Sequence, residues 1–328
     1  MSSKTMPRKA LICGIGGQDG TYLAQLLLSK DYAVWGTSRD AHVSTFSNLS
    51  ALGIKERVIL VSMASNDFRS VLATLKRSDP DEVYFLSGQT SVGLSFEQPV
   101  ETLESITLGT LNLLEAIRFL EKPIKLYHAS SSECFGDVGT VASDERTPFH
   151  PRSPYAVAKA SAHWLVANYR EAYGLFACNG ILFNHESPLR PARFVTRKII
   201  SAACRIANGS AEKLELGKLN IVRDWGWAPD YVEAMWRMLQ QDNVDDFIIA
   251  TGEANSLEEF VNYTFTSLGL DWRDHVVSNS ALFRPTDLFW SQGNPAKAER
   301  VLGWRSSSKM REVIQKMISG EVNRISSL

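Results

Sequence analysis

The sequence has little of several features that mark specialised classes of protein. Basic and acidic residues nearly cancel, and the formal net charge of −1 argues against a nucleic-acid-binding surface. The chain has only four cysteines, with no metal-binding spacing, which favours buried thiols in a reducing compartment. No apolar run reaches the roughly 20 residues that span a bilayer, and the first residues do not resemble a signal peptide. We therefore expect a cytoplasmic protein with no metal, no nucleic acid and no membrane partner.

What is present is the composition of an ordinary globular chain with a full-sized core. Hydrophobic residues make up 44% and charged residues 22% of the 328 residues. At roughly 100–200 residues per domain, this length predicts two domains, or one large unit with an appended lobe.

Short apolar runs alternate with segments of helical period along the first half of the chain. Strands are expected at 10–13, 33–37, 58–62, 83–86, 124–129 and 177–182, with helices at 22–29, 68–77, 101–120 and 156–173. Further on we expect helices at 195–207 and 231–240, strands near 219–222 and at 246–251, and a mostly helical last third. This alternation predicts βαβ units and a parallel sheet covered by helices on both faces.

The expected fold class is therefore α/β: a Rossmann-like, doubly wound parallel sheet with a smaller, mostly helical C-terminal lobe. We expect the Rossmann domain to comprise residues 1–183 plus about 219–253, and the lobe to comprise about 184–218 plus 254–328.

The first expected strand runs directly into a glycine-rich segment. Gly14, Gly17 and Gly20 are spaced three apart, and a helix is expected to begin just behind them. Glycine permits a tight turn and lets the backbone approach a pyrophosphate at the positive N-terminus of a helix. Because the segment follows the first strand of a βαβ unit, a dinucleotide site is favoured over an ordinary turn.

The end of the second expected strand is where dinucleotide-binding proteins select the ribose. It reads Ser38-Arg39-Asp40. Arginine there favours the additional phosphate of NADP, whereas an acidic residue favours NAD. Arg39 indicates NADP, whereas the carboxylate of Asp40 beside it would repel the additional phosphate. Alternatively, Arg39 is a solvated loop residue with no role in cofactor binding.

A set of candidate catalytic side chains follows the fifth expected strand: a hydroxyl, a carboxylate, a phenol and an ammonium group. Ser131 and Glu133 follow this strand, and Tyr155 and Lys159 lie four residues apart, so that they share one face of a helix. A phenol with a pKa near ~10 is a poor base at neutral pH. A neighbouring ammonium stabilises the phenolate and lowers that pKa, so we expect Tyr155 to act as a base.

These motifs resemble those of the extended short-chain dehydrogenase/reductases and, more narrowly, of the GDP-mannose 4,6-dehydratase family. The resemblance covers nearly the whole chain, from about residue 9 to about residue 325. It rests on residues 17–23, 151–155, 168–171, 182–188, 194–198, 223–226, 230–236 and 294–304. The Asn-His-Glu-Ser-Pro run at 184–188 is the most specific of these segments.

The resemblance implies a role for each matching residue. The catalytic residues would be Ser131, Glu133, Tyr155 and Lys159. NADP would be bound by Gly14, Gly17, Gln18, Asp19, Gly20, Arg39, Ser62, Met63, Leu86, Gln89, Tyr155, Lys159, His185 and Arg190. Asn184, Lys198, Arg223 and Arg284 match positions near the GDP moiety, where cationic donors suit a diphosphate.

The reaction that the resemblance implies converts GDP-mannose to GDP-4-keto-6-deoxymannose. Tyr155 takes the C4 hydroxyl proton while hydride leaves C4 for NADP⁺. Glu133 then removes the C5 proton as the C6 hydroxyl departs as water, and hydride returns to C6. Glu133 favours a dehydratase, since epimerases and ketoreductases of this fold usually lack a carboxylate at that position.

Several departures from the family pattern leave alternatives open. Arg39-Asp40 replaces two arginines, Ser62-Met63 stands where an Asp is usual, and the cofactor loop at 86–90 is a variant. The alternatives are NAD as cofactor, a GDP-manno-heptose as substrate, a GDP-hexose reductase or epimerase, and a non-enzymatic sensor of these ligands. A homo-oligomer is implied as well, either a dimer or a tetramer that uses the loop at about 39–48.

Overall fold

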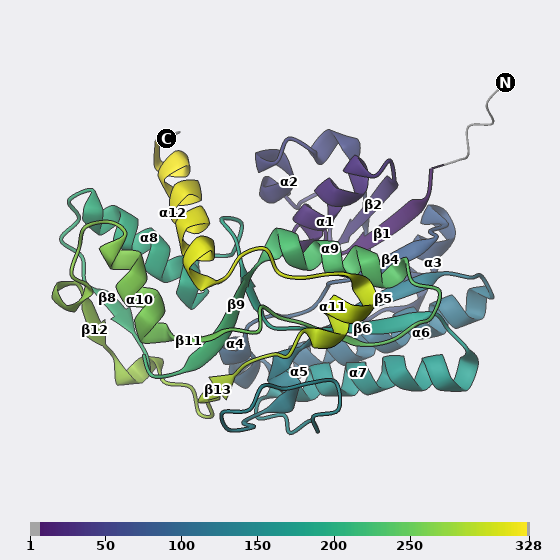
Figure 1. Ribbon diagram of the computed structural model, residues 1–328. Coiled ribbons are helices and arrows are strands. Elements are labelled where there is room, and N and C mark those ends of the chain that lie inside the picture. The colour runs from purple at the N-terminus through teal and green to yellow at the C-terminus, as the bar shows by residue number, and fades with distance from the viewer. Residues whose placement is uncertain (1–6, 327–328) are drawn as a thin grey trace. The chain divides into compact units, whose positions relative to one another are not determined.

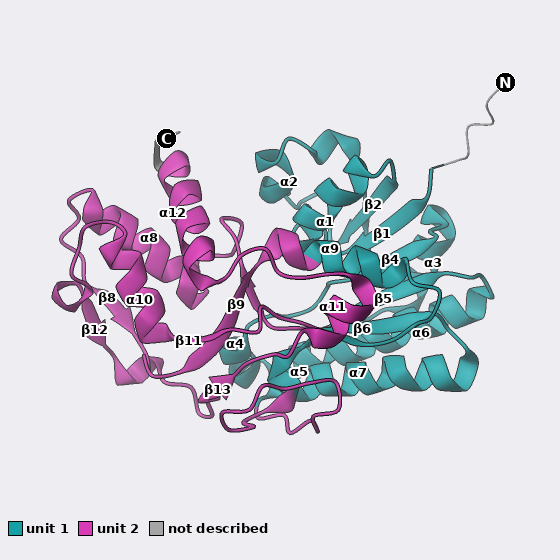
Figure 2. Ribbon diagram, viewed as in Figure 1, with its two compact units in different colours: residues 1–134, 153–181, 232–247 teal, residues 135–152, 182–231, 248–328 magenta. Residues whose placement is uncertain are grey.

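The computed structural model of the protein describes residues 7–326 (Figure 1). The chain forms two compact units, each assembled from three separate segments (Figure 2). Unit 1 comprises the chain up to residue 134 together with 153–181 and 232–247, and unit 2 comprises 135–152, 182–231 and the chain from 248. The division into a cofactor domain and a substrate lobe stays a prediction, because it concerns which ligand each part binds.

A seven-stranded sheet with the strand order β10-β6-β5-β4-β1-β2-β3 is the framework of unit 1. The strands are β1 (Lys9–Cys13), β2 (Ala33–Ser38), β3 (Ile59–Ser62), β4 (Glu82–Phe85), β5 (Lys125–Ser131), β6 (Ala177–Leu182) and β10 (Phe247–Ile249). Strand β1 pairs in parallel with β2 on one side and with β4 on the other. The order therefore reverses between β3 and β4, which creates the crevice where doubly wound sheets bind ligands. The expected Rossmann-like fold is confirmed.

Helices cover this sheet. They are α1 (Gln18–Ser29), α2 (Ser47–Ala51), α3 (Phe68–Ser78), α4 (Val92–Glu97), α5 (Pro99–Leu103), α6 (Gly109–Leu120), α7 (Pro154–Tyr173) and α9 (Ala228–Leu239). One core cluster joins Val71 of α3, Leu113 of α6 and Val166 of α7 to the buried side chains of β1, β4 and β5. These three helices therefore pack on one face of the sheet.

The ends of α7 follow from local sequence signals. The Ser153 hydroxyl caps its N-terminus by accepting from the Ala156 amide at 3.1 Å, and Pro154 occupies the first helical turn. Gly174, with φ of +67°, ends the helix in the left-handed conformation that glycine adopts without strain. The helix that carries Tyr155 and Lys159 is thus defined at both ends by its own residues.

Unit 2 combines helices with short strands, of which the sequence predicted the one now seen as β9 and missed the others. The helices are α8 (Val195–Ala207), α10 (Leu257–Thr266), α11 (Ala296–Leu302) and α12 (Met310–Ser326). Strands β7 (Asn184–Glu186), β9 (Val222–Trp227), β11 (Ala254–Ser256) and β13 (Trp290–Ser291) form one sheet, and β8 (Leu214–Leu216) pairs with β12 (Val276–Ser278). Its core is built around Trp225 and Phe260, whose rings lie 5.2 Å apart. Within residues 7–326, no helix combines the length and apolar character needed to cross a membrane.

Candidate active site

The glycine-rich segment forms a tight cradle between β1 and α1. Gly14 has φ of +87°, and a Cβ atom there would lie 3.1 Å from the Leu86 carbonyl carbon. At Gly20 a Cβ atom would lie 2.4 Å from the Gly14 oxygen, so no larger residue fits without movement. Gly17 is the N-cap of α1, and Gln18 and Asp19 form its first turn. The backbone is therefore shaped to admit a phosphate at a helix N-terminus, which fits a dinucleotide.

The segment after β2, which includes α2, braces this cradle in a way that sequence analysis missed. The side-chain amide of Asn48 donates to the Gly16 backbone oxygen at 3.1 Å. A Cβ atom on Gly16 would lie 3.4 Å from the Phe46 ring, which is buried. No motif marks either residue, and the only signal in the sequence was their place in the loop at 39–48.

Predicted cofactor-binding residues lie at the C-terminal ends of β2 and β3, which are paired strands. Arg39 is largely exposed and its guanidinium lies 3.2 Å from the Glu101 carboxylate. The Asp40 carboxylate instead accepts from the amides of His42 and Val43, at 2.9 and 3.2 Å, and so faces its own loop. Ser62 accepts from the Ala41 amide at 2.9 Å, and Met63 is buried behind it.

The segment that follows β4 passes beside the cradle. The Leu86 amide donates to the Cys13 oxygen at 3.0 Å, which extends the β1–β4 pairing to the start of this segment. The Gln89 amide donates to the Ser105 hydroxyl at 3.2 Å. The structure therefore places Leu86 and Gln89 at the same edge of the sheet as the glycine segment.

Tyr155 and Lys159 lie one helical turn apart on α7, and both are buried. The Lys159 ammonium donates to the Ala129 oxygen of β5 at 2.7 Å and lies 5.9 Å from the centre of the Tyr155 ring. Burial lowers the pKa of Lys159 to about 8, because removal from water disfavours the charged form. The pair predicted from its four-residue spacing is thus held beside the C-terminal part of β5.

Ser131 and Glu133 stand where β5 ends. Ser131 is buried and is the last residue of the strand, and its hydroxyl accepts from the Glu133 amide at 3.3 Å. Glu133 is half-buried in a short 3₁₀ helix, Ser132–Phe135. The neighbouring Cys134 is fully buried, and burial raises the pKa of its thiol to about 12, which suits a packed core residue.

Unit 2 holds the remaining predicted cofactor residues, His185 and Arg190. The His185 Nδ1 atom lies 2.7 Å from the Phe183 oxygen, and its ring stacks on Tyr231 at 4.5 Å. The Arg190 guanidinium lies 3.3 Å from the Glu186 carboxylate and 3.9 Å from the centre of the Phe194 ring.

Two of the predicted GDP-binding residues converge on one carboxylate within unit 2. Buried Arg223 of β9 lies 3.3 Å from Asp287, and Arg284 lies 3.8 Å from the same oxygen. The Lys198 ammonium of α8 donates instead to the backbone oxygen of Glu215, at 2.7 Å. Asn184 is half-buried and is the first residue of β7. The arginine pair provides a compact cationic group of the kind that binds phosphates.

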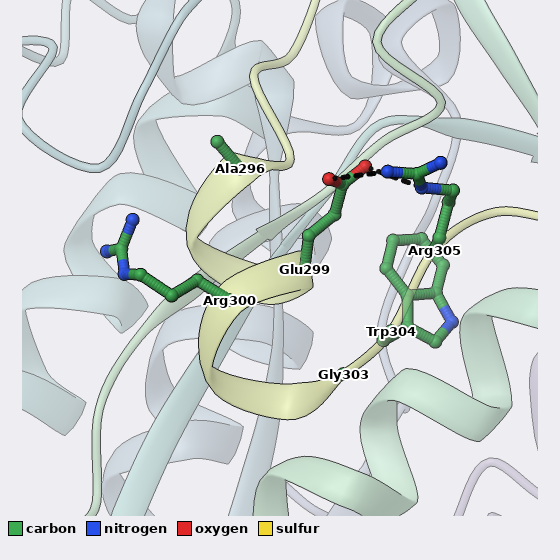
Figure 3. Close-up of a pocket in the computed structure, with 6 residues that line it drawn as sticks. All are labelled: Ala296, Glu299, Arg300, Gly303, Trp304 and Arg305. Atoms are coloured by element: carbon green, nitrogen blue, oxygen red, sulfur yellow. Dashed lines mark hydrogen bonds and ion pairs between the residues drawn. The ribbon is translucent and has the colours of Figure 1, made fainter.

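A shallow pocket beside α11 is separate from these residues (Figure 3). Its lining includes Trp304 and the ion pair in which Arg305 lies 3.0 Å from Glu299. No predicted site residue contributes to it, and we assign it no role. In the described part of the chain, no group of three or more His, Cys, Asp or Glu side chains is arranged to hold a metal ion.

A Rossmann fold with a hydroxyl at the end of β5 and Tyr-x-x-x-Lys on the next helix defines a short-chain dehydrogenase/reductase. Solved structures share this fold. A dTDP-glucose 4,6-dehydratase from Streptomyces venezuelae, determined with NAD, has a TM-score of 0.87 at 20% identity, covering 97% of this chain and 98% of its own. The RMD protein of Pseudomonas aeruginosa, complexed with NADPH, has a TM-score of 0.79 at 23% identity, covering 97% and 99%.

The sequence narrows this class to one family. The model of the GDP-mannose 4,6 dehydratase family matches residues 11–317, and the chain belongs to this family. GDP-mannose 4,6 dehydratase 2 of Arabidopsis thaliana is 45% identical over 332 residues, covering 98% of this chain and 89% of the relative. GDP-mannose 4,6-dehydratase of Yersinia enterocolitica is 40% identical over 351 residues, covering 97% and 94%.

Proposed function

We propose that the protein is a GDP-mannose 4,6-dehydratase, which converts GDP-mannose to GDP-4-keto-6-deoxymannose with loss of water. The observation that carries this proposal is the position of Glu133. The Ser131 hydroxyl accepts a hydrogen bond from the Glu133 backbone amide, and the Glu133 carboxylate comes two residues after the residue proposed to hold the reacting oxygen. Membership of the family supports the same substrate and reaction.

The first half of the reaction is an oxidation at C4 of the sugar. The Ser131 hydroxyl binds the C4 oxygen, and Tyr155 accepts the proton of the C4 hydroxyl as the carbonyl forms. The Lys159 ammonium stabilises the Tyr155 phenolate. A nicotinamide cofactor held at the glycine segment, Gly14 to Gly20, would supply the hydride acceptor for C4 and, at the end of the turnover, the hydride donor for C6.

The second half is an elimination. The C4 ketone acidifies the proton on C5, and Glu133 accepts this proton. The C6 hydroxyl then leaves as water, taking a proton from the Glu133 carboxyl group. Glu133 thus ends the step as a carboxylate. When hydride adds to C6, C5 takes up a proton and Tyr155 gives up the one it accepted from the C4 hydroxyl, so that no net acid or base is consumed.

We also propose NADP rather than NAD as the cofactor. The supporting observation is that the Asp40 carboxylate is occupied by hydrogen bonds from the His42 and Val43 amides of its own loop, while Arg39 is exposed after the end of β2. Replacing the guanidinium in Arg39→Ala should weaken NADP⁺ binding about tenfold and change NAD⁺ binding less than twofold. Fluorescence titration of both cofactors measures this, with exposed Arg57→Ala as the matched control. Equal losses for the two cofactors contradict the proposed selectivity.

The proposed GDP-binding residues belong to unit 2. Arg223 and Arg284 supply charge to the diphosphate, with Lys198 and Asn184 as further donors. His185 and Arg190 of the same unit are proposed cofactor contacts. The cytoplasmic location expected from the sequence stays a prediction.

Homo-oligomerisation is proposed through one apolar face of unit 1. Trp164, 61% exposed, and Val157 lie seven residues apart on α7, and Val100 and Leu103 are exposed on α5, which packs beside α7. These side chains form an apolar face of the kind that marks a protein interface. A second copy of the chain would cover it.

Mass spectrometry of GDP-mannose incubated with the purified protein, without added reductant, tests the proposed activity. We expect loss of one water and transfer of a C4 deuterium label to C6 of the product. Isomerisation without loss of water, or a need for added reduced cofactor, would indicate an epimerase or a reductase. If GDP-mannose stays unchanged and GDP-manno-heptose is dehydrated, the substrate is GDP-manno-heptose. Binding of these GDP-sugars without turnover of either one would support a non-enzymatic sensor.

A further inference from the structure

The helical run that begins with α5 and ends with α6 is interrupted by an irregular turn. Residues Glu104–Leu108 form a π-helix, here called the π-turn. The backbone stays helical on both sides, with φ and ψ of −67° and −43° at Leu103 and −58° and −42° at Gly109. Such turns are rare in proteins, and they occur frequently at functional sites.

Three consecutive residues of the π-turn contact the proposed catalytic parts of unit 1. The Ser105 hydroxyl accepts from the Gln89 amide at 3.2 Å. Buried Ile106 packs in a cluster that includes Tyr155. The Thr107 hydroxyl donates to the Ala158 oxygen of α7 at 3.1 Å. One turn of helix therefore touches both the cofactor loop and the helix that carries the proposed base.

The wide turn explains why neighbouring residues all reach this region. In a regular α-helix, with 3.6 residues per turn, successive side chains point about 100° apart. A π-helix bonds each amide five residues back, so each residue turns the chain through a smaller angle and neighbours stay closer to one face. Removal of one residue would restore the α-helical period and move Ser105 and Thr107 away from their partners.

The cofactor loop is fitted to the π-turn at Gly88. This glycine has φ of +126°, and a Cβ atom on it would lie 2.9 Å from a side-chain carbon of Ile106. The Ile106 side chain thus fills the space that a larger residue would need. Ala158, the partner of Thr107, directly precedes Lys159, so this hydrogen bond acts on the backbone between the proposed base and the ammonium.

We propose that the π-turn is a positioning element of the active site, in which Thr107 fixes α7 at Tyr155 and Lys159 while Ser105 fixes the cofactor loop at Gln89. The inference rests on the proposed dehydratase function. Neither residue touches the reacting atoms in this account, and each acts through the residue it holds.

The first test compares Thr107→Val with Thr107→Ser. Valine keeps the volume but loses the hydrogen bond, and we expect kcat to fall about three- to tenfold while KM for GDP-mannose changes less than twofold. Serine keeps the donor and should retain most of the wild-type kcat. Thr74→Val on α3 is the matched control, since that buried hydroxyl bonds only within its own helix, at 2.8 Å. Equal kcat for Thr107→Val and wild type overturns the role of Thr107.

The second test does not depend on turnover. Ser105→Ala should weaken NADP⁺ binding about three- to fivefold in a fluorescence titration, because the Gln89 amide loses its acceptor. Unchanged binding overturns the role of Ser105. A wild-type protein that does not dehydrate GDP-mannose refutes the proposed function instead, and the binding result still decides whether the π-turn positions the cofactor loop.

Discussion

At the scale of single residues, the proposed chemistry depends most on Glu133. In Glu133→Gln the amide cannot accept the C5 proton, so we expect dehydration to fall roughly 10²- to 10⁴-fold. Cofactor affinity and thermal stability should stay near wild type, because the side chain is half-buried at a strand end. Product formation followed by mass spectrometry measures the loss, with exposed Glu121→Gln as control. Turnover at the wild-type rate would show that another group is the base.

Lys159 gives the activity a dependence on pH. Its pKa, lowered by burial to about 8 from an ordinary value of 10.5, means that the ammonium is lost in the folded protein above about pH 8. We expect kcat to fall as the pH rises through 8, since neutral lysine stabilises the phenolate poorly. In Lys159→Arg, where the cation persists, the residual activity should lack this fall. A wild-type kcat that stays constant up to pH 10 contradicts the assignment.

The same lysine affects stability with the opposite trend. Between about pH 8 and 10.5 the unfolded chain binds the proton and the folded chain does not. The unfolded state therefore binds more protons in this window, so the contribution of Lys159 to the free energy of unfolding rises with pH there. Below pH 8 both states are protonated, and the buried charge lowers stability by a constant amount. Above about pH 8, therefore, kcat is expected to decrease while the contribution of Lys159 to the free energy of unfolding increases.

Several residues were predictable because their chemistry requires a fixed local spacing. Tyr155 and Lys159 share a helical face because they are four apart. Gly14 has the positive φ that favours glycine, and a Cβ atom at Gly20 would clash with the Gly14 oxygen. Asn48 and Thr107 were not predictable. Their partners, Gly16 and Ala158, are 32 and 51 residues away in sequence, and each contact exists only after tertiary folding.

At the scale of elements, helix α2 supports the phosphate cradle through Asn48. Asn48→Ala removes the donor to Gly16, and we expect NADP⁺ affinity to fall about fivefold, corresponding to one hydrogen bond of about 1 kcal/mol. Isothermal titration measures the affinity. Asn208→Ala is the control, because that amide bonds only within α8, at 2.8 Å. Unchanged NADP⁺ affinity would mean that the cradle holds its shape without this brace.

The strands of unit 1 were predictable to within one or two residues because helices bury both of their faces. Short strands of unit 2 were missed, and the strand expected at 219–222 lies at β9, Val222–Trp227. Two- and three-residue strands such as β13 and β7 are too short for a period to show. The helix expected at 101–120 is correct in extent, but its π-turn was not foreseen, since no residue type signals a change from 3.6 residues per turn.

At the scale of the whole molecule, the apolar face of α5 and α7 predicts self-association. Trp164→Glu places a charge on this face, so we expect the oligomer to dissociate to a smaller species. Light scattering coupled to size-exclusion chromatography measures the mass. Val322→Glu on α12, outside this face, is the control with a similar change of charge. An unchanged mass for Trp164→Glu would show that the copies associate elsewhere.

The three-part construction of unit 1 has a consequence for synthesis on the ribosome. Strand β6 is buried along its whole length, but its outer neighbour β10 does not emerge until residue 249. The residue just before β10, Asp246, also holds Arg170 at 2.8 Å and the Asn179 amide at 2.7 Å. Once β1 to β6 have been synthesised, the hydrophobic edge of β6 stays uncovered until some 65 further residues have been added and β10 can pair with it. We expect the growing chain to need chaperones during that interval, and a truncated message to yield an aggregating fragment rather than a folded unit 1.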